Sequence, residues 1–92
     1  MRLEWTEVAL ADRESIYDYI ESDNPRAALA LDERFHNRAA RLENFPHLGR
    51  PGRVANTREL VVHKNYVLVY EIEGEIVRIL RVLHTSRLWP MQ

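Results

Sequence analysis

The chain is 92 residues long, with 46% hydrophobic and 29% charged residues, a composition typical of one soluble globular domain spanning residues 1–92. It contains no cysteine, which excludes a disulfide framework, a cysteine-ligated metal site and a thiol nucleophile. A net charge of −1 argues against general electrostatic binding of nucleic acid, and no apolar run approaches the ~18 residues of a membrane span, so we expect a cytoplasmic protein with no membrane partner.

The charge is divided unevenly between the two halves of the chain. Residues 1–48 hold 6 Arg and 10 Asp or Glu, a balance of −4, whereas residues 49–92 hold 7 Arg or Lys and 4 Glu, a balance of +3. Two interpretations stay open. Acidic helices cover a sheet that happens to be basic, or the second half presents a basic surface to an anionic partner.

A short strand and a helix are predicted at the start of the chain. The segment RLEWT, residues 2–6, alternates apolar and charged side chains, as a half-buried strand does. Thr6 is a suitable N-cap for a helix over residues 7–22. The apolar face of this helix is expected to consist of Leu10, Ile16, Tyr17 and Ile20.

A second helix is predicted over residues 25–44. Asn24 is a good N-cap, and Pro25 suits the first helical position, where its missing N–H costs nothing. The apolar positions at helical spacing are Ala28, Leu31, Phe35 and Leu42. Because few residues separate the two helices, we expect an antiparallel helical hairpin.

Three strands are predicted in the second half, after a loop rich in proline and glycine. They cover residues 58–63, 66–72 and 75–84. The two-residue connections Lys64-Asn65 and Glu73-Gly74 are short enough for hairpin turns, which makes the three strands an antiparallel meander.

The element order β-α-α-β-β-β predicts an α+β domain, a small antiparallel sheet with the antiparallel helical hairpin packed on one face. The other sheet face then stays free. Because alternation points Val67 and Val69 to that face, a hydrophobic partner is expected to cover it.

Two arginines of the last strand, Arg78 and Arg81, fall on opposite faces if the alternation is regular. They are therefore not expected to act together. At least one of them is expected to pair with a helix carboxylate such as Asp18 or Glu21.

Arginine and histidine side chains in the last strands are the groups that metal-free RNA cleavage needs. The 2′-hydroxyl attacks the adjacent phosphate, so a base removes one proton, an acid supplies another and a cation stabilises the developing charge. His84 is a candidate acid, Glu59 or His63 a candidate base, and Arg81 a candidate cation. A histidine at a strand end is also common as an ordinary surface residue, so both interpretations stay open.

No metal or other cofactor is expected. The four histidines, at positions 36, 47, 63 and 84, lack the i, i+4 spacing of helical zinc ligands. Neither a Gly-rich phosphate loop nor a GxSxG nucleophile elbow is present.

Over essentially its whole length the chain resembles the RelE/ParE superfamily of toxins from bacterial type II toxin–antitoxin modules. The segments that carry the resemblance, in order, are LEWTEVALADRESIYDYI, LENFPHLGRPGR, TRELVV, YVLVYEI and VRILRVLHTSRLWP. The resemblance implies the fold expected above and a partner, a small antitoxin whose tail fills a groove of the toxin. It also implies one of two targets: RelE-like members cut mRNA at the ribosome without a metal, and ParE-like members poison DNA gyrase.

Residue by residue, the resemblance favours the ParE-like branch. His84 occupies a position where the ribonucleases often place a catalytic histidine, and Arg81 matches a basic position common to both branches. Thr85 stands where a tyrosine often follows, and Val67 stands where ribonuclease members carry an arginine. We therefore expect a toxin of a plasmid-stabilisation type module that poisons gyrase, with the ribosome-dependent ribonuclease as the alternative.

The catalytic candidates, which apply only to a ribonuclease, are Arg81, His84 and Glu59. The residues expected to bind the target or the antitoxin are Arg53, Arg58, His63, Lys64, Tyr66, Arg87 and Trp89. With an antitoxin as partner, the expected assembly is a toxin–antitoxin hetero-oligomer.

Overall fold

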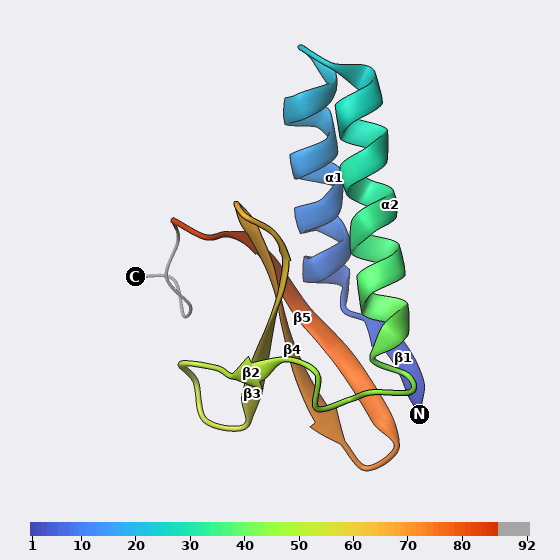
Figure 1. Ribbon diagram of the computed structural model, residues 1–92, viewed down its shortest axis with the longest axis vertical. Helices are drawn as coiled ribbons and strands as arrows, with labels where there is room; N and C mark the ends of the chain where they lie inside the picture. The colour runs from blue at the N-terminus through green and yellow to red at the C-terminus, as the bar shows by residue number, and fades with distance from the viewer. Residues whose placement is uncertain (87–92) are drawn as a thin grey trace.

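Three long strands form the centre of the sheet in the computed structural model, which describes residues 1–86 (Figure 1). They are β3 (Thr57–His63), β4 (Tyr66–Glu73) and β5 (Ile76–His84). The three follow one another as an antiparallel meander, as the two short turns predicted.

Two short strands flank this meander, giving the sheet order β1-β5-β4-β3-β2. Strand β1 (Arg2–Trp5) pairs with β5, and β2 (Arg50–Pro51) pairs with β3. The α+β class is confirmed, with two differences in detail. The sheet is mixed, because β1 runs parallel to β5 and the intervening helices supply the long connection that parallel pairing needs. Strand β2 forms within the segment predicted as a loop.

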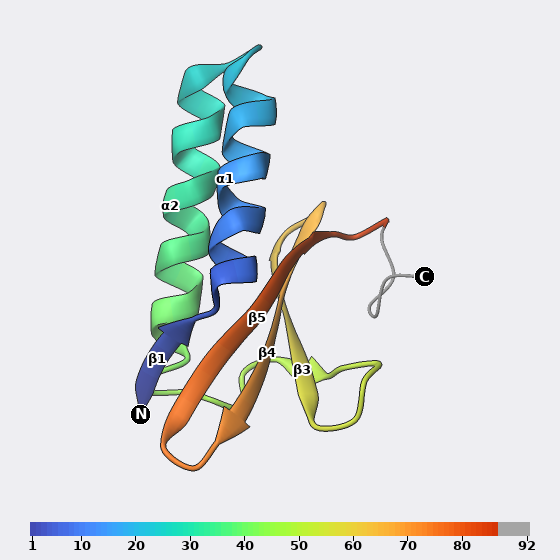
Figure 2. The ribbon, with the colours of Figure 1, turned by 180° about the vertical axis from the view of Figure 1, so that it is seen from behind.

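Two helices stand as an antiparallel hairpin beside the sheet, and their upper ends project beyond it (Figures 1 and 2). Helix α1 (Glu7–Glu21) begins after Thr6, whose hydroxyl accepts a hydrogen bond from the amide three residues on, at 3.1 Å. Helix α2 (Pro25–Arg41) begins after Asn24, whose side-chain oxygen accepts in the same way at 3.1 Å. Both predicted caps are confirmed.

The apolar face predicted for α2 is confirmed, whereas that of α1 is partly wrong. Phe35 and Leu42 are buried, as expected from their spacing. Leu10 is 48% exposed, and the buried residue of α1 is its neighbour Ala9. Ala9 lies two helical turns before Ile16, so these two share the face that meets the sheet, and Leu10 lies to one side of it.

One ion pair, between Arg13 of α1 and Asp32 of α2, joins the two helices. Arg13 donates to both carboxylate oxygens of Asp32, from Nε at 2.9 Å and from Nη2 at 2.8 Å. The same guanidinium lies 4.6 Å from the ring centroid of Trp5 in β1. Arg13 therefore ties both helices to the first strand through a charge-assisted fork and a cation–π contact.

A bulge in β5 interrupts the regular alternation of its side chains. Val69 of β4 pairs with Arg81 and Tyr70 pairs with Ile79, so Leu80 is an extra residue on β5. As a result Ile79 and Val82 both pack in the core between sheet and helices.

The bulge also decides on which face the two arginines of β5 lie. Arg78 pairs with Glu71 and Arg81 pairs with Val69, two residues apart on β4, so both arginines start from the same face. The prediction that they lie on opposite faces is wrong, because the inserted residue resets the alternation.

The sheet face away from the helices carries a second apolar cluster. It consists of Val67, Val69 and Leu83, which are 8%, 0% and 4% exposed. The expectation of a free apolar face is therefore wrong. We call residues 50–56 the arm. Two of its residues, Arg50 and Arg53, line one small cavity together with this cluster.

Candidate functional site

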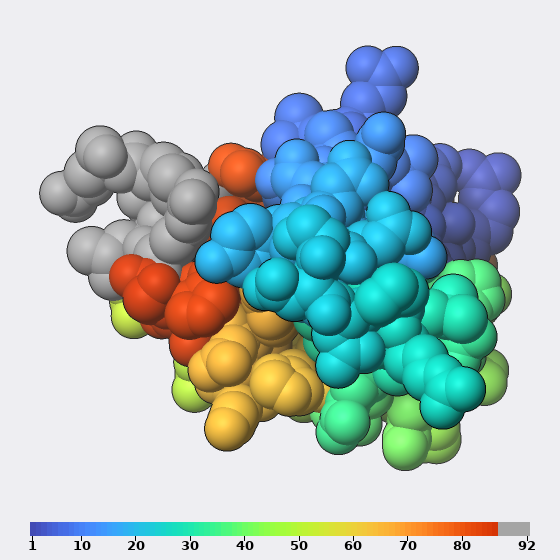
Figure 3. Space-filling model, turned by 90° about the horizontal axis from the view of Figure 1, so that it is seen from above, coloured from blue at the N-terminus to red at the C-terminus, as the bar shows by residue number. Residues whose placement is uncertain are grey.

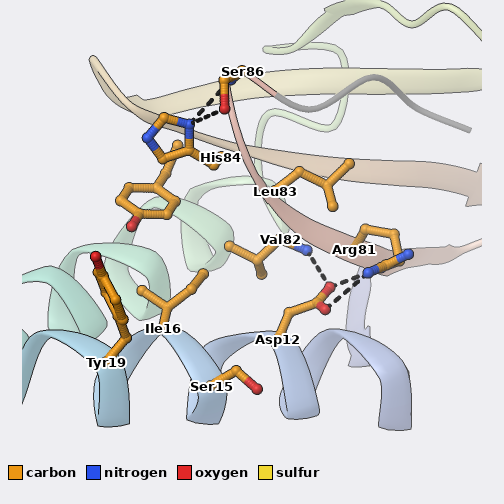
Figure 4. A pocket seen from close by; sticks show the side chains of 10 residues that line it. Asp12, Ser15, Ile16, Tyr19, Arg81, Val82, Leu83, His84 and Ser86 are labelled. Carbon is orange, nitrogen blue, oxygen red and sulfur yellow. Dashed lines mark hydrogen bonds and ion pairs between the residues drawn. The ribbon is translucent and has the colours of Figure 1, made fainter. Parts of the chain in front are cut away.

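The outer edge of β5 is covered by β1 along only half its length. β1 pairs with Ile76–Ile79, and the chain then turns through Thr6 into α1. At this turn the Thr6 amide donates to Ile79 O at 3.1 Å, and the Thr6 hydroxyl donates to Leu80 O at 3.1 Å. Beyond Leu80, side chains of α1 face the edge of β5 instead of a strand (Figure 4).

Asp12 of α1 occupies the first part of this edge. Its carboxylate accepts from Arg81 Nε at 2.8 Å, from Arg81 Nη2 at 3.0 Å and from the Val82 amide at 2.9 Å (Figure 4). The hydrogen bond to this carboxylate raises the pKa of Arg81 above its usual value. A helix carboxylate was predicted as partner of an arginine of β5, but the structure supplies Asp12 and not Asp18 or Glu21.

The other arginine, Arg78, pairs within the sheet. Its guanidinium Nη1 lies 2.8 Å from Glu71 and 3.4 Å from Glu73, and its Nε lies 3.5 Å from Glu4. These carboxylates raise the pKa of Arg78, the hydrogen bond to Glu71 most. Arg78 and Arg81 are thus held by different partners on different elements.

A cavity of about 530 Å³ follows Asp12 along the edge of β5. Side chains of α1 form one wall, and the end of β5 forms the other (Figure 4). Tyr66 and His84 lie at its far end, and both also line a second cavity of about 690 Å³. We call the two cavities together the helix–sheet groove.

The second cavity lies between the projecting helix ends and the β3–β4 turn. Seen from above, that turn and the end of β5 lie beside the helix ends (Figure 3). Its helical lining consists of Tyr19, Ile20, Ala27, Ala30, Leu31 and Arg34. The groove exists because the helices extend past the sheet, so their apolar inner face finds no strand there.

Tyr66 is the centre of an aromatic cluster between the two cavities. Its ring meets Phe35 at 5.7 Å and His84 at 5.2 Å between centroids, both nearly edge-on. His63 lies on another side, at 6.2 Å. The pairing of Tyr66 with both histidines across the sheet brings together three residues predicted as site residues.

Both histidines of this cluster are held by local backbone hydrogen bonds. His63 Nδ1 accepts from the Asn65 amide at 3.2 Å, and His84 Nδ1 accepts from the Ser86 amide at 3.1 Å. An imidazole whose Nδ1 accepts carries its proton on Nε2 when neutral. Each ring therefore keeps an Nε2–H group that can donate to a ligand.

Glu59, the candidate base, lies on the other face of the sheet. It pairs with Val69 of the second apolar cluster, and its side chain is 10% exposed. One carboxylate oxygen lies 3.4 Å from Arg50 Nη2, and the other accepts from the Arg53 amide at 3.3 Å. Glu59 thus anchors the arm, and the sheet separates it from His84.

The remaining predicted residues lie apart from the groove or beside it. Arg53 belongs to the arm, and Arg58 donates to Gly49 O at 2.7 Å. Lys64 lies in the β3–β4 turn next to the aromatic cluster. Arg87 and Trp89 lie outside the described residues.

Within residues 1–86, no group of three His, Cys, Asp or Glu side chains is placed to hold a metal ion. None of the helices in this part of the chain is long and apolar enough to span a bilayer.

Among the residues of the groove that were missed from the sequence are Asp12, Tyr19 and Arg34. A signal for Asp12 was available. It lies one turn before Ile16 and two turns before Tyr19, so it is an acidic residue on an otherwise apolar helix face. Tyr19 and Arg34 line the groove only because of the way the two helices pack together.

Residues 3–89 match the family model described as the ParE toxin of the type II toxin–antitoxin system parDE. The chain belongs to the ParE toxin family. It is thus a toxin of a type II module, and a cognate antitoxin is its partner. The ParE-like interpretation of the sequence is confirmed at the level of the family.

Two relatives are also named for toxicity. A Sinorhizobium fredii protein whose name describes it as a candidate toxin, Y4kP, is 40% identical over 97% of this chain and 93% of its own length. Toxin RelE2 of Caulobacter vibrioides is 40% identical over 91% of this chain and 94% of its own length.

Among solved structures, this ParE-family chain is similar to a chain of the chromosomal ParDE system of P. aeruginosa, with a TM-score of 0.82 and 27% identity over 91% of this chain and 95% of that one. It shares the fold of a YoeB/ParE toxin from Agrobacterium tumefaciens, with a TM-score of 0.63 and 16% identity over 91% and 98% of the two chains.

Proposed function

We propose that this toxin acts in the cytoplasm by binding and poisoning DNA gyrase, and that it does not cut RNA. The observation that carries the proposal is that Asp12 holds Arg81, the candidate cation, by two hydrogen bonds. Of the two candidate bases, Glu59 lies on the opposite face of the sheet from His84, whereas His63 lies beside His84 in the groove. Metal-free cleavage needs a base, an acid and a cation around one phosphate. A phosphate beside His84 in the groove would have the sheet between it and Glu59.

The candidate cation is also committed elsewhere. Arg81 gives two hydrogen bonds to Asp12, in a pair whose side chains are only 22% and 15% exposed. Moving its guanidinium to a phosphate would leave the carboxylate of Asp12 poorly solvated, at a cost of a few kcal/mol.

On the other sheet face, Glu59 lies beside an apolar cluster and two arginines of the arm. Val67, Val69 and Leu83 line the small cavity beside it, and Val67 stands where ribonuclease members carry an arginine. Nearby, Arg50 is paired with Glu59 itself. The described lining of this cavity therefore offers Arg53 as a cation but no histidine that could act as the acid.

The alternative, a ribosome-dependent ribonuclease, is supported by the similarity to a protein named Toxin RelE2. The two functions predict different first effects in the cell. Inducing the chain without its antitoxin and following labelled thymidine and leucine incorporation separates them. We expect thymidine incorporation to fall first; an earlier fall in leucine incorporation with intact DNA synthesis would favour the ribonuclease.

A further inference from the structure

The helix–sheet groove is lined by hydrogen-bond donors and aromatic rings, although the protein as a whole is slightly acidic. Arg34, His63 and His84 line its second cavity, and no carboxylate of the described residues does. The first cavity contains Asp12, which already accepts three hydrogen bonds. Within the described residues, the groove therefore offers hydrogen-bond donors to a ligand, and it has no carboxylate available to pair with a cation of a partner.

The donors converge on Tyr66 from two strands. His63 ends β3 and His84 ends β5, and both rings contact the Tyr66 ring. Because each Nδ1 is occupied by a backbone amide, the free donor of each ring is its Nε2–H. In the close view the second nitrogen of His84 points away from Ser86 (Figure 4).

The helical wall beside these donors is apolar and partly made of small residues. Ala27, Ala30, Leu31 and Ile20 line it. Two alanines allow a helix or an extended chain to approach closely, and the larger neighbours give it apolar contacts. A ligand of this groove therefore combines apolar side chains with an anionic group.

We propose that Tyr66, His63 and His84 form a carboxylate-binding subsite for an Asp or Glu side chain of the antitoxin. The apolar neighbours of that residue pack on the alanine-containing wall of α2. This inference refines the proposed function and rests on its premise that an antitoxin binds this toxin. It does not depend on gyrase being the target. Charge complementarity favours this occupant: Arg34 has no ion pair within residues 1–86, and it lies on the same lining.

Nucleic acid is the other anionic occupant to consider. Its phosphates would meet the same donors, but the apolar wall would remain uncovered, and the groove lacks the row of arginines and lysines that duplex binding uses. A protein segment uses both halves of the lining.

The test measures binding of short overlapping peptides that tile the antitoxin encoded with this toxin, by calorimetry or fluorescence anisotropy. The double variant His63→Phe/His84→Phe keeps aromatic rings and removes both Nε2–H donors. His84→Gln keeps a side-chain N–H donor and guards against a folding defect in the phenylalanine variants. His36→Phe is the matched control, since His36 is exposed on α2 outside the groove.

We expect one peptide to bind the unmodified toxin and the double variant to bind it at least about tenfold more weakly, as for lost hydrogen bonds to a charged group. His36→Phe should bind unchanged and His84→Gln should retain most of the affinity. Replacing one Asp or Glu of that peptide by Asn or Gln should weaken its binding to the unmodified toxin by the same factor. The same replacement should hardly change its binding to the double variant.

If the double variant bound every peptide as tightly as the unmodified toxin does, the subsite would be refuted. A loss that is independent of every acidic residue in the peptide, or preferential binding of an oligonucleotide at the groove, would refute it too. These results are independent of the target. A toxin that stops DNA synthesis but binds its antitoxin unchanged after the double substitution refutes the subsite alone.

Discussion

Asp12 and Arg81 lie 69 positions apart in the sequence and are joined by two hydrogen bonds of 2.8 and 3.0 Å. The same carboxylate accepts the Val82 amide, so one side chain of α1 satisfies the edge of β5 where β1 has ended. This contact fixes the wall of the helix–sheet groove and keeps Arg81 away from the solvent.

Removing this carboxylate should destabilise the fold. We expect Asp12→Ala to lower the free energy of unfolding by about 2–4 kcal/mol, because it removes the carboxylate that accepts hydrogen bonds from Arg81 and from the Val82 edge amide. Urea denaturation checks this. Asp18→Ala, at an exposed carboxylate of the same helix, is the control and should change stability by less than about 0.5 kcal/mol. Equal losses in both variants would contradict the role given to Asp12.

Tyr70 links the core to the segment that precedes β2. Its hydroxyl accepts from the Gly49 amide at 2.9 Å and donates to Pro46 O at 2.7 Å. Tyr70→Phe leaves both backbone groups without this partner, and we expect a loss of about 1–3 kcal/mol in the free energy of unfolding. A variant as stable as the unmodified protein would mean that water replaces the hydroxyl without cost.

The same residue predicts a loss of stability at alkaline pH. Burial raises the pKa of Tyr70, so the unfolded chain releases this proton at lower pH than the folded protein does. Its contribution is complete below the unfolded value of about 10 and is lost as the pH rises through the folded value. The stability gap between the unmodified protein and Tyr70→Phe should therefore narrow from pH 8 to pH 11 in denaturation curves. A constant gap would contradict the shift.

Replacing Glu59 tests whether this carboxylate acts as a catalytic base or only anchors the arm. As an anchor of the arm, Glu59→Gln should still accept the Arg53 amide, so we expect growth arrest at equal expression to persist. A ribonuclease that uses Glu59 as its base would lose activity by a factor of about 10²–10⁴. Plating after induction, with the folded fraction checked by circular dichroism, distinguishes these results.

Much of the fold follows from local sequence. Asn24 and Pro25 mark the start of α2, and two-residue turns fix the meander, because capping and hairpin chemistry act over a few residues. The bulge at Leu80 could not be predicted in this way. It lets the carbonyl of Leu80 reach Thr6, a contact between segments far apart in the chain.

The candidate site was predictable only in part. Tyr66, His63 and His84 lie at strand ends that the meander brings together, so their proximity follows from the topology. The position of Glu59 behind the sheet depends on the register of β3 against β4, which the sequence leaves open. Asp12 was not predicted as a site residue, because its contact with β5 depends on where the pairing of β1 with β5 ends.

The central claim, that this toxin poisons gyrase, is tested most directly with purified protein. Toxin released from its antitoxin is incubated with gyrase, ATP and supercoiled plasmid, and the DNA is resolved after denaturation and protease treatment. We predict linear plasmid from trapped cleavage complexes, which disappears when antitoxin is added first. Unchanged plasmid and unchanged supercoiling activity, together with mRNA cut in a translating extract, would contradict the proposed function.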